Sequence, residues 1–263
     1  MGSREEAARL ILAGAVRVNG ALADKPAKLV TAEAEVSLVG RGSPFVGRGG
    51  EKLAAALDRF GISPAGMTCF DVGCSTGGFT DCLLQRGAVR VYAVDVGYGQ
   101  FDWRLRQDPR VILMERVNVR YLDASLISDP IDLIVIDVSF ISLTLVLPAV
   151  VPCLAATGSV VTLVKPQFEV GKGQVGRGGI VRDDRLREGA VEKVVTCALG
   201  LSLELVDQFD SPVEGRKGNR EILAWFRPGS SARSSAQHKK TLRDGEEGVL
   251  SRTESSTEMD RRR

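Results

Sequence analysis

The sequence predicts an α/β fold with a mostly parallel sheet that has helices on both faces, preceded by a small N-terminal module. From Met67 onward, apolar runs typical of buried strands alternate with amphipathic segments typical of helices. The first strand runs into a glycine-rich turn after Asp71, and Asp95 ends the second strand. This arrangement is typical of sheets that bind a nucleoside cofactor at the carboxyl ends of their strands.

The composition predicts one full hydrophobic core and a small appendage, since 44% of the 263 residues are apolar. The net charge is +2, and the polar segment 229–263 carries eight Lys and Arg against six Asp and Glu. The rest of the chain has 27 charges of each sign, so evidence for nucleic-acid binding has to come from local clusters. We expect residues 229–263 to be disordered, because they have almost no apolar content.

The sequence contains no signal of secretion or membrane insertion. The N-terminus lacks the basic and apolar regions of a signal peptide. The apolar stretch Leu133 to Val151 contains Asp137 and Pro148, which fits a buried strand followed by a helix better than a membrane span. The five cysteines form no C-x-x-C pair and have no neighbouring histidine. We therefore expect a cytoplasmic protein with reduced cysteines, no metal site and no stable membrane association.

Residues 1–40 predict a small α/β module. A capping-box pattern precedes a helical stripe, two short strands flank an Asn19-Gly20 turn, and a further strand is expected at Ala34 to Leu38. The run 14–20, Gly-Ala-Val-Arg-Val-Asn-Gly, resembles the second half of the RNA-binding module of ribosomal protein S-four, so we expect a partial module. The alternative is a small packing or oligomerisation module.

The glycine-rich residues 41–51 predict a linker, and a helix is expected from Lys52 to Phe60. Arg48 in this linker could contact phosphate groups, although a solvated linker would have the same composition. Lys52 falls in the first turn of the helix, where the helix dipole does not favour a cation. Lys52 is therefore either a solvated lysine or an amine placed for a function.

The main domain, residues 52–228, is expected to alternate between strands and helices. The strands fall near 68–72, 90–95, 110–113, 132–137, 158–164, 202–209 and 221–226, and the helices near 79–86, 101–107, 120–127, 143–154 and 183–199. The last two strands flank a turn-rich segment, which predicts an antiparallel pair with an antiparallel strand at the edge of the sheet.

The turn after the first strand has more than one interpretation. Gly73 to Gly77 matches the G-x-S-x-G elbow of serine hydrolases, but the one histidine, His238, lies in the polar tail, which argues against a Ser-His-Asp hydrolase. Ser75 also occupies the middle glycine position of the dinucleotide motif G-x-G-x-x-G. An ordinary strand–turn–helix unit without a ligand is the remaining alternative.

Charged residues lie where several predicted strands end or begin. Asp137 and Lys165 follow apolar runs, and Glu221 begins the last strand. Because the carboxyl ends of parallel strands meet at the ligand crevice, we expect Asp137 and Lys165 to lie near Asp71 and Asp95. Glu221 should reach the same edge from the amino end of an antiparallel strand. A purely structural ion pair between Lys165 and Asp137 is the alternative.

Three segments of the main domain carry specific motifs: Asp95 to Gln100 (DVGYGQ), Asp137 to Ser142 (DVSFIS) and 164–176 (VKPQFEVGKGQVG). Through these, nearly all of residues 3–227 resembles the TlyA family, the haemolysin A-type ribosomal RNA 2′-O-methyltransferases. The resemblance implies a Rossmann-like class I methyltransferase fold with a seven-stranded sheet. It also implies S-adenosylmethionine as cofactor and a ribose in ribosomal RNA as substrate, with cytidine in assembled subunits as the expected target.

The resemblance further implies a catalytic tetrad of Lys52, Asp137, Lys165 and Glu221. A ribose 2′-hydroxyl that attacks the sulfonium methyl group needs a base at neutral pH. Lys165 is our candidate, because a neighbouring ammonium at Lys52 and partial desolvation would favour the neutral amine. Asp137 would orient Lys165, and Glu221 would position Lys52 or the ribose.

Contacts with both substrates follow from the same resemblance. The cofactor is expected at the glycine turn, the strand ends and the residues beside them, namely Asp71, Gly73, Ser75, Gly77, Gly78, Phe79, Asp95, Val96, Asn118, Asp137, Ser139 and Phe140. RNA is expected at Arg4, Arg17, Arg48, Lys172 and Arg177. For the glycine-rich loop that holds the last two, a plain flexible lid is an equal interpretation.

Two functions of other classes are alternatives. A membrane-lysing protein is suggested by the historical name of the family, but the sequence has neither a credible span nor a strong amphipathic basic helix. A non-catalytic module that binds a nucleoside cofactor or RNA would require the charged tetrad to be incidental.

Overall fold

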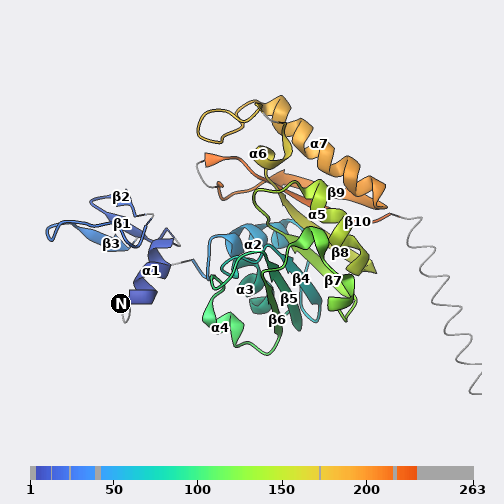
Figure 1. Cartoon of the computed structure of the whole chain (residues 1–263), viewed down its shortest axis with the longest axis horizontal. Helices are drawn as coiled ribbons and strands as arrows, with labels where there is room; N and C mark the ends of the chain where they lie inside the picture. Colours follow the sequence, from blue (N-terminus) through green and yellow to red (C-terminus); the bar gives the residue numbers. More distant parts are fainter. Residues whose placement is uncertain are drawn as a thin grey trace, which may run out of the picture.

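The computed structural model describes residues 4–12, 14–23, 25–38, 43–171, 173–215 and 218–229. These residues form a small N-terminal module and a larger α/β domain, which Figure 1 shows side by side. Disorder was expected for residues 229–263, of which 230–263 lie outside the described residues. Gly229 is described, and its N–H donates to the carbonyl of Ser202.

The N-terminal module consists of helix α1 (Arg4–Leu12) and a three-stranded antiparallel sheet. The strands are β1 (Val16–Val18), β2 (Ala21–Leu22) and β3 (Val36–Leu38), in the order β2-β1-β3. Asn19 and Gly20 both have positive φ angles, of 50° and 75°, as a two-residue hairpin turn of type I′ requires. The predicted hairpin and the third strand are confirmed.

The main domain is built on a seven-stranded sheet in the order β6-β5-β4-β7-β8-β10-β9. The strands are β4 (Thr68–Val72), β5 (Arg90–Asp95), β6 (Val111–Glu115), β7 (Ile131–Ile136), β8 (Leu154–Val164), β9 (Leu203–Asp210) and β10 (Ile222–Pro228). The first five run parallel, and β10 is antiparallel to both β8 and β9. The antiparallel pair is confirmed, and it lies at the end of the sheet. The strand that runs opposite to the others, β10, was expected at the edge, but it lies between β8 and β9, so β9 forms the edge.

Helices cover both faces of this sheet (Figure 1). They are α2 (Gly49–Phe60), α3 (Gly78–Gln85), α4 (Trp103–Arg106), α5 (Leu143–Val150), α6 (Pro166–Glu169) and α7 (Asp184–Gly200). Apolar side chains of α2 and α3 pack with one face of β4 and β7, and those of α5 and α7 pack with the opposite face. The alternation of side chains along each strand thus produces a separate core on each face.

Several helix boundaries differ from the prediction. Residues 120–127 form two 3₁₀ turns, η1 (Val119–Tyr121) and η2 (Ala124–Leu126), instead of a helix. The side chains of Asn118 and Asp123 each accept a hydrogen bond from a backbone N–H two residues on, so each starts a new turn.

Two further boundaries depend on glycine and proline. Helix α2 begins at Gly49, so residues 49–51 of the predicted linker are helical. Helix α5 contains Pro148 and gives way to the 3₁₀ turn η3 (Val151–Cys153), which makes β8 longer than predicted.

The order of the strands positions the site. After β4 the chain builds β5 and β6 on one side, then crosses to β7 on the other side. A sheet that reverses its winding in this way has a crevice at the carboxyl ends of its two central strands, here β4 and β7.

Replacing Phe226 with alanine should destabilise the fold. The side chain is fully buried on β10, and deletion of a buried phenylalanine costs about 3–5 kcal/mol. The free energy of unfolding in urea measures the loss. Val206→Ala on neighbouring β9 is the control, because that side chain is 45% exposed and should cost well under about 1 kcal/mol. Equal losses would contradict the assigned core.

Candidate active site

The candidate site lies at the carboxyl edge of the main sheet. The turn 73–77 follows β4, and Asp137 directly follows β7. Lys165 follows β8, and Glu221 precedes the antiparallel β10. Ile222 pairs with Val164 in the ladder between β10 and β8. Glu221 and Lys165 therefore come next to each other at the end of that ladder.

The four predicted tetrad residues form two ion pairs. Lys165 Nζ lies 2.6 Å from Asp137 Oδ1, and Lys52 Nζ donates to Glu221 Oε2. The exposed side-chain fractions are 11% and 21% in the first pair and 11% and 4% in the second. Both pairs are thus largely removed from water, where loss of one partner leaves an uncompensated charge. Each lysine has its own carboxylate.

Ser139 completes the surroundings of Lys165. The Lys165 ammonium donates a hydrogen bond to Ser139 Oγ at 3.0 Å. Ser139 was predicted to contact the cofactor, and the structure places its hydroxyl beside the tetrad. The hydroxyl and the Asp137 carboxylate together fix the direction of the Lys165 side chain.

Glycines allow the turn after β4 to lie against the rest of the site. Gly73 has a φ of 87°, and a side chain there would meet the carbonyl oxygen of Asp137 at 2.5 Å. Gly77 has a φ of 95° and faces Leu105, while Gly78 packs against the backbone of Gly50. Only glycine combines this conformation with these close approaches. Phe79, the second residue of α3, is buried.

Asp95 holds the open side of the turn. Its Oδ2 accepts a hydrogen bond from the N–H of Ser75 at 2.8 Å, and Oδ1 accepts one from the N–H of Gly97 at 2.6 Å. Ser75 itself has a positive φ of 49°. Gln100 Nε2 also donates to Oδ1 at 3.3 Å. A carboxylate offers about four acceptor positions, so Asp95 keeps capacity for one hydroxyl of the predicted ribose.

Asp71 lies beneath the turn and is completely buried. Its Oδ2 accepts a hydrogen bond from the Thr80 hydroxyl at 2.6 Å, whereas Oδ1 has no hydrogen-bond partner among the described residues. Burial raises the pKa of Asp71 to about 7, although the Thr80 hydrogen bond acts in the opposite direction. A buried carboxylate oxygen without a donor is costly unless a ligand supplies one.

The remaining predicted cofactor residues are largely exposed. Val96 is 73% exposed, and Asn118 is exposed with its side chain used as the cap of η1. Phe140 is 92% exposed, has a φ of 64° and contacts Phe168 with ring centroids 5.1 Å apart. Their contacts with a cofactor stay predictions.

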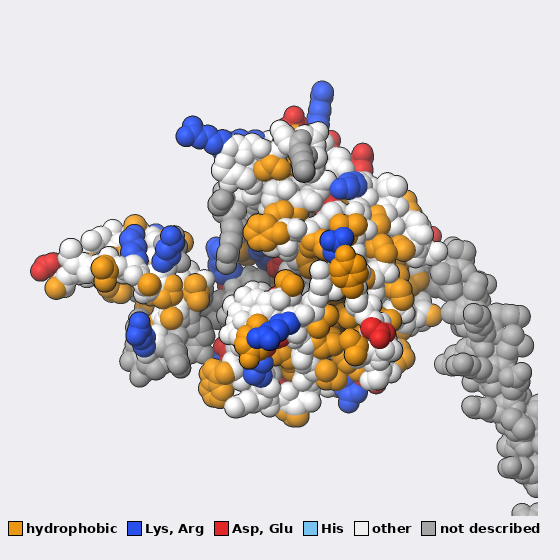
Figure 2. Space-filling view, viewed as in Figure 1, with side chains coloured by type: hydrophobic (Ala, Val, Ile, Leu, Met, Phe, Trp, Pro, Cys, Tyr) orange, Lys and Arg blue, Asp and Glu red, His pale blue; other side chains and the backbone are white. Residues whose placement is uncertain are grey.

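The predicted RNA-binding arginines Arg4, Arg17, Arg48 and Arg177 are all exposed, and Lys172 lies outside the described residues. Arg17 donates a hydrogen bond to the carbonyl of Gly20 at the hairpin turn. Figure 2 shows Lys and Arg side chains on the N-terminal module and on the upper left of the main domain. RNA contact at these positions stays a prediction.

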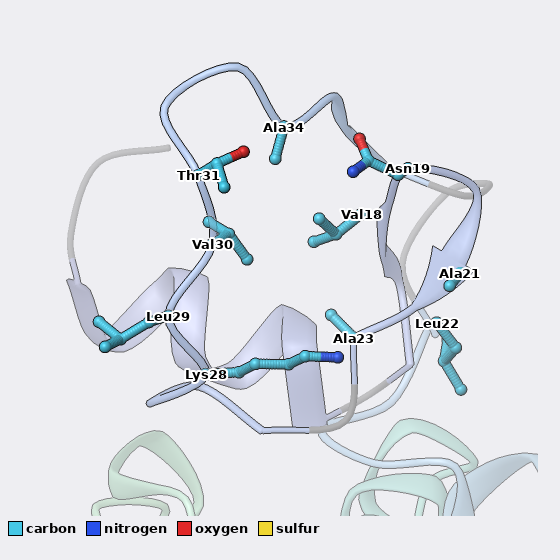
Figure 3. Close-up of a pocket in the computed structure, with 10 residues that line it drawn as sticks. All are labelled: Val18, Asn19, Ala21, Leu22, Ala23, Lys28, Leu29, Val30, Thr31 and Ala34. Atoms are coloured by element: carbon cyan, nitrogen blue, oxygen red, sulfur yellow. The ribbon is translucent and has the colours of Figure 1, made fainter.

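A hollow of about 280 Å³ is present in the N-terminal module (Figure 3). Apolar side chains such as Val18, Leu22 and Val30 line it, and Lys28 is its one charged lining residue. None of the tetrad or glycine-turn residues belongs to it. This hollow is therefore separate from the candidate site at the sheet edge.

Comparison with known proteins identifies both parts of the chain. Residues 45–228 match the model of FtsJ-like methyltransferases, and residues 1–36 match that of S4 domains. The chain belongs to the FtsJ-like methyltransferase family. Its TlyA relative from Mycobacterium tuberculosis, named a 16S/23S rRNA (cytidine-2′-O)-methyltransferase, is 50% identical over 86% of this chain and 84% of the relative.

Solved structures agree with the fold of this FtsJ-like chain. A Streptococcus thermophilus protein described as a hemolysin has a TM-score of 0.72 and 41% identity, over 94% of each chain. A Listeria monocytogenes protein described as an S-adenosylmethionine-dependent methyltransferase has a TM-score of 0.52 and 14% identity, over 68% of this chain and 99% of that one. The predicted class I methyltransferase fold is confirmed.

Two further properties of this FtsJ-like protein concern the described part of the chain alone. No helix there has the length and apolar content needed to cross a membrane. No cluster of three or more His, Cys, Asp or Glu side chains is placed there to hold a metal ion.

The sequence analysis missed residues that hold the site in place. The N–H of Val46 donates to Asp81 Oδ2 on α3 at 2.9 Å, so the chain before α2 is attached to the helix that follows the glycine turn. Asn219, two residues before Glu221, is buried, and its side chain both accepts and donates a hydrogen bond. The sequence around Asn219 gave no indication of what its side chain contacts.

The burial of Asp71 predicts a pH dependence of stability. Its pKa rises from 3.8 to about 7 on folding, so the folded protein binds the proton more tightly and loses stability as pH rises between these values. The loss is at most about 4 kcal/mol. Asp71→Asn keeps an acceptor for Thr80 and cannot ionise, so urea unfolding of this variant should lack that loss between pH 5 and 8. Parallel pH profiles for variant and wild type would contradict the assignment.

Proposed function

We propose that this protein transfers a methyl group from S-adenosylmethionine to a ribose 2′-oxygen of ribosomal RNA, at a cytidine in assembled subunits. The observation that carries the proposal is the pair of desolvated lysine–carboxylate contacts beside the glycine turn. The name of the M. tuberculosis relative supplies the expected substrate. In this proposal residues 52–228 form the catalytic domain, residues 41–51 link it to the N-terminal module, and residues 1–40 contact RNA.

The residues around the turn suit the cofactor. The orphaned Oδ1 of buried Asp71 can accept a hydrogen bond from the amino group of the methionine moiety. Gly73 and Gly77 let the turn pack directly against the backbone of Asp137 and the side chain of Leu105, which fixes the turn for the cofactor. Asp95 retains one acceptor position for a hydroxyl group. Bound S-adenosylmethionine would supply an activated methyl group.

Lys165 is the proposed base. It would take the proton of the 2′-hydroxyl on Nζ as the oxygen forms its bond to the methyl carbon and the sulfur–carbon bond breaks. Asp137 and Ser139 hold Nζ in a fixed direction. Nζ can accept this proton only as a neutral amine. An ammonium that only orients the ribose oxygen is the competing role.

The N-terminal S4 match and the exposed arginines support RNA as the second substrate. Arginine side chains at the surface would contact phosphates and position the substrate without reading its sequence. A protein that modifies ribosomal RNA would act in the cytoplasm, where cysteines stay reduced, in agreement with its five free cysteines.

Incubation with labelled S-adenosylmethionine and separate small subunits, large subunits and deproteinised RNA tests the function. We expect label at a ribose 2′-oxygen of cytidine in an intact subunit, mapped by mass spectrometry. If the protein binds the cofactor but transfers no label to either subunit or to deproteinised RNA, the assignment of ribosomal RNA as its substrate is wrong. Because relatives carry the name hemolysin, leakage of dye-filled vesicles is measured in parallel and should stay at background.

Substitution of Lys165 tests the base. Lys165→Ala should lower kcat by about 10²–10⁴ fold, as expected for loss of a general base, with little change in cofactor Kd. Lys165→Arg separates the two roles, because arginine keeps the charge but does not release its proton.

An active Lys165→Arg variant would show that orientation suffices. Lys193→Ala is the matched control. Lys193 is a half-exposed lysine that donates to the carbonyl of Glu169, and its loss should leave kcat within about twofold.

A further inference from the structure

The loop between α6 and α7 is tied to the turn that carries Glu221. Asn219 in this turn is 3% exposed. Its Oδ1 accepts a hydrogen bond from the N–H of Val181 at 3.2 Å, and its Nδ2 donates to the carbonyl of Gly179 at 2.8 Å. Both ends of one buried amide thus hold the same segment, which we name the arm (residues 173–181).

The described residues of the arm form a tight turn that is held by hydrogen bonds within the arm. The N–H of Gly176 donates to the carbonyl of Ile180, and the N–H of Gly179 donates to the carbonyl of Gly176. Gly178 and Gly179 have φ angles of 82° and 81°, which the tight turn requires. Arg177 is exposed within this turn. Figure 1 shows the arm extending outward between α6 and α7.

Through its backbone, Asn219 is also connected to the tetrad. Its carbonyl accepts a hydrogen bond from the N–H of Gly215 at 2.9 Å, and Gly215 lies directly against the Glu221 carboxylate. Glu221 in turn pairs with Lys52. One short turn therefore carries both the anchor of the arm and a tetrad carboxylate.

We propose that Asn219 is a positioning residue that fixes Arg177 of the arm relative to the Glu221–Lys52 pair, so that a phosphate of the RNA substrate is held in register with the tetrad. The nature of the substrate rests on the function proposed above. A glycine-rich segment without this anchor would have to be ordered during binding, and that ordering weakens binding. The amide suits the task because it supplies a donor and an acceptor together.

Limited trypsin digestion of the free protein tests the anchor. In Asn219→Ala, cleavage after Arg177, located by mass spectrometry, should be roughly tenfold faster than in wild type, because cleavage follows local opening. The control is Arg220→Ala. Arg220 is the adjacent exposed residue and pairs with Asp210 and Asp184. Its loss should leave cleavage after Arg177 unchanged, and unchanged cleavage in Asn219→Ala would overturn the proposal.

A double-mutant cycle tests the link to the substrate. Asn219→Ala should raise the KM for the ribosomal subunit roughly tenfold and leave cofactor Kd within about twofold. Arg177→Ala should also raise that KM in the wild type, but hardly at all in the Asn219→Ala background. If the two factors multiply, Asn219 does not act through Arg177 and the proposal is wrong. A purely structural role would instead lower cofactor binding and transfer together.

A second variant covers the case in which Asn219→Ala does not fold. Asn219→Asp has nearly the same shape and keeps the acceptor for Val181, but at neutral pH it has no donor for Gly179. Cleavage after Arg177 should then be faster than in wild type, and an unchanged rate would again overturn the proposal. Proteolysis does not depend on methyl transfer. A wild-type protein without transfer activity would therefore contradict the proposed function and leave the test of the anchor intact.

Discussion

The lack of a side chain at Gly73 lets the turn after β4 lie against the backbone of Asp137. Any larger residue would meet that carbonyl oxygen at 2.5 Å. The lack of a side chain at Gly78 likewise lets it pack against the backbone of Gly50 at the start of α2. Three segments distant in the sequence are thereby brought to one crevice, with the ligand turn on one side and the charged residues on the other.

The charged residues of the crevice depend on the whole domain. Lys52 and Glu221 are separated by 169 positions, and Lys165 and Asp137 come from neighbouring strands. Ion pairs so far from water are favourable only when geometry is precise and further polar groups are satisfied. The register between β7 and β8 brings Asp137 and Lys165 to neighbouring strand ends, and the register between β8 and β10 places Glu221 beside Lys165.

The strands, and the edge of the sheet where the charged residues gather, were predicted well. An apolar run indicates a buried strand, and the polar residue that follows it marks where the strand ends. The Asn19-Gly20 hairpin was predictable from local conformational preference. The four-residue helix α6 was not, because one turn leaves no periodic pattern. The place of β10 also escaped prediction, since strand order depends on contacts between distant segments.

Within the site, the residue types at the strand ends were predictable, whereas their partners were not. Spacing alone could not show that Lys52 pairs with Glu221 while Lys165 pairs with Asp137. It also gave no signal for Asn219, because an asparagine in a turn usually bonds to its own backbone and not to a loop 40 residues away.

The contrast in exposure between the paired lysines and the surface arginines has a consequence for ionic strength. Mobile ions screen charges that face water, and they screen buried pairs much less. Lys52 and Lys165 belong to the second class, whereas Arg17, Arg48 and Arg177 belong to the first. Added salt therefore acts selectively on this molecule. In the function proposed above, it would weaken contacts between these arginines and a polyanion such as RNA, while the lysine–carboxylate pairs inside the crevice remain intact.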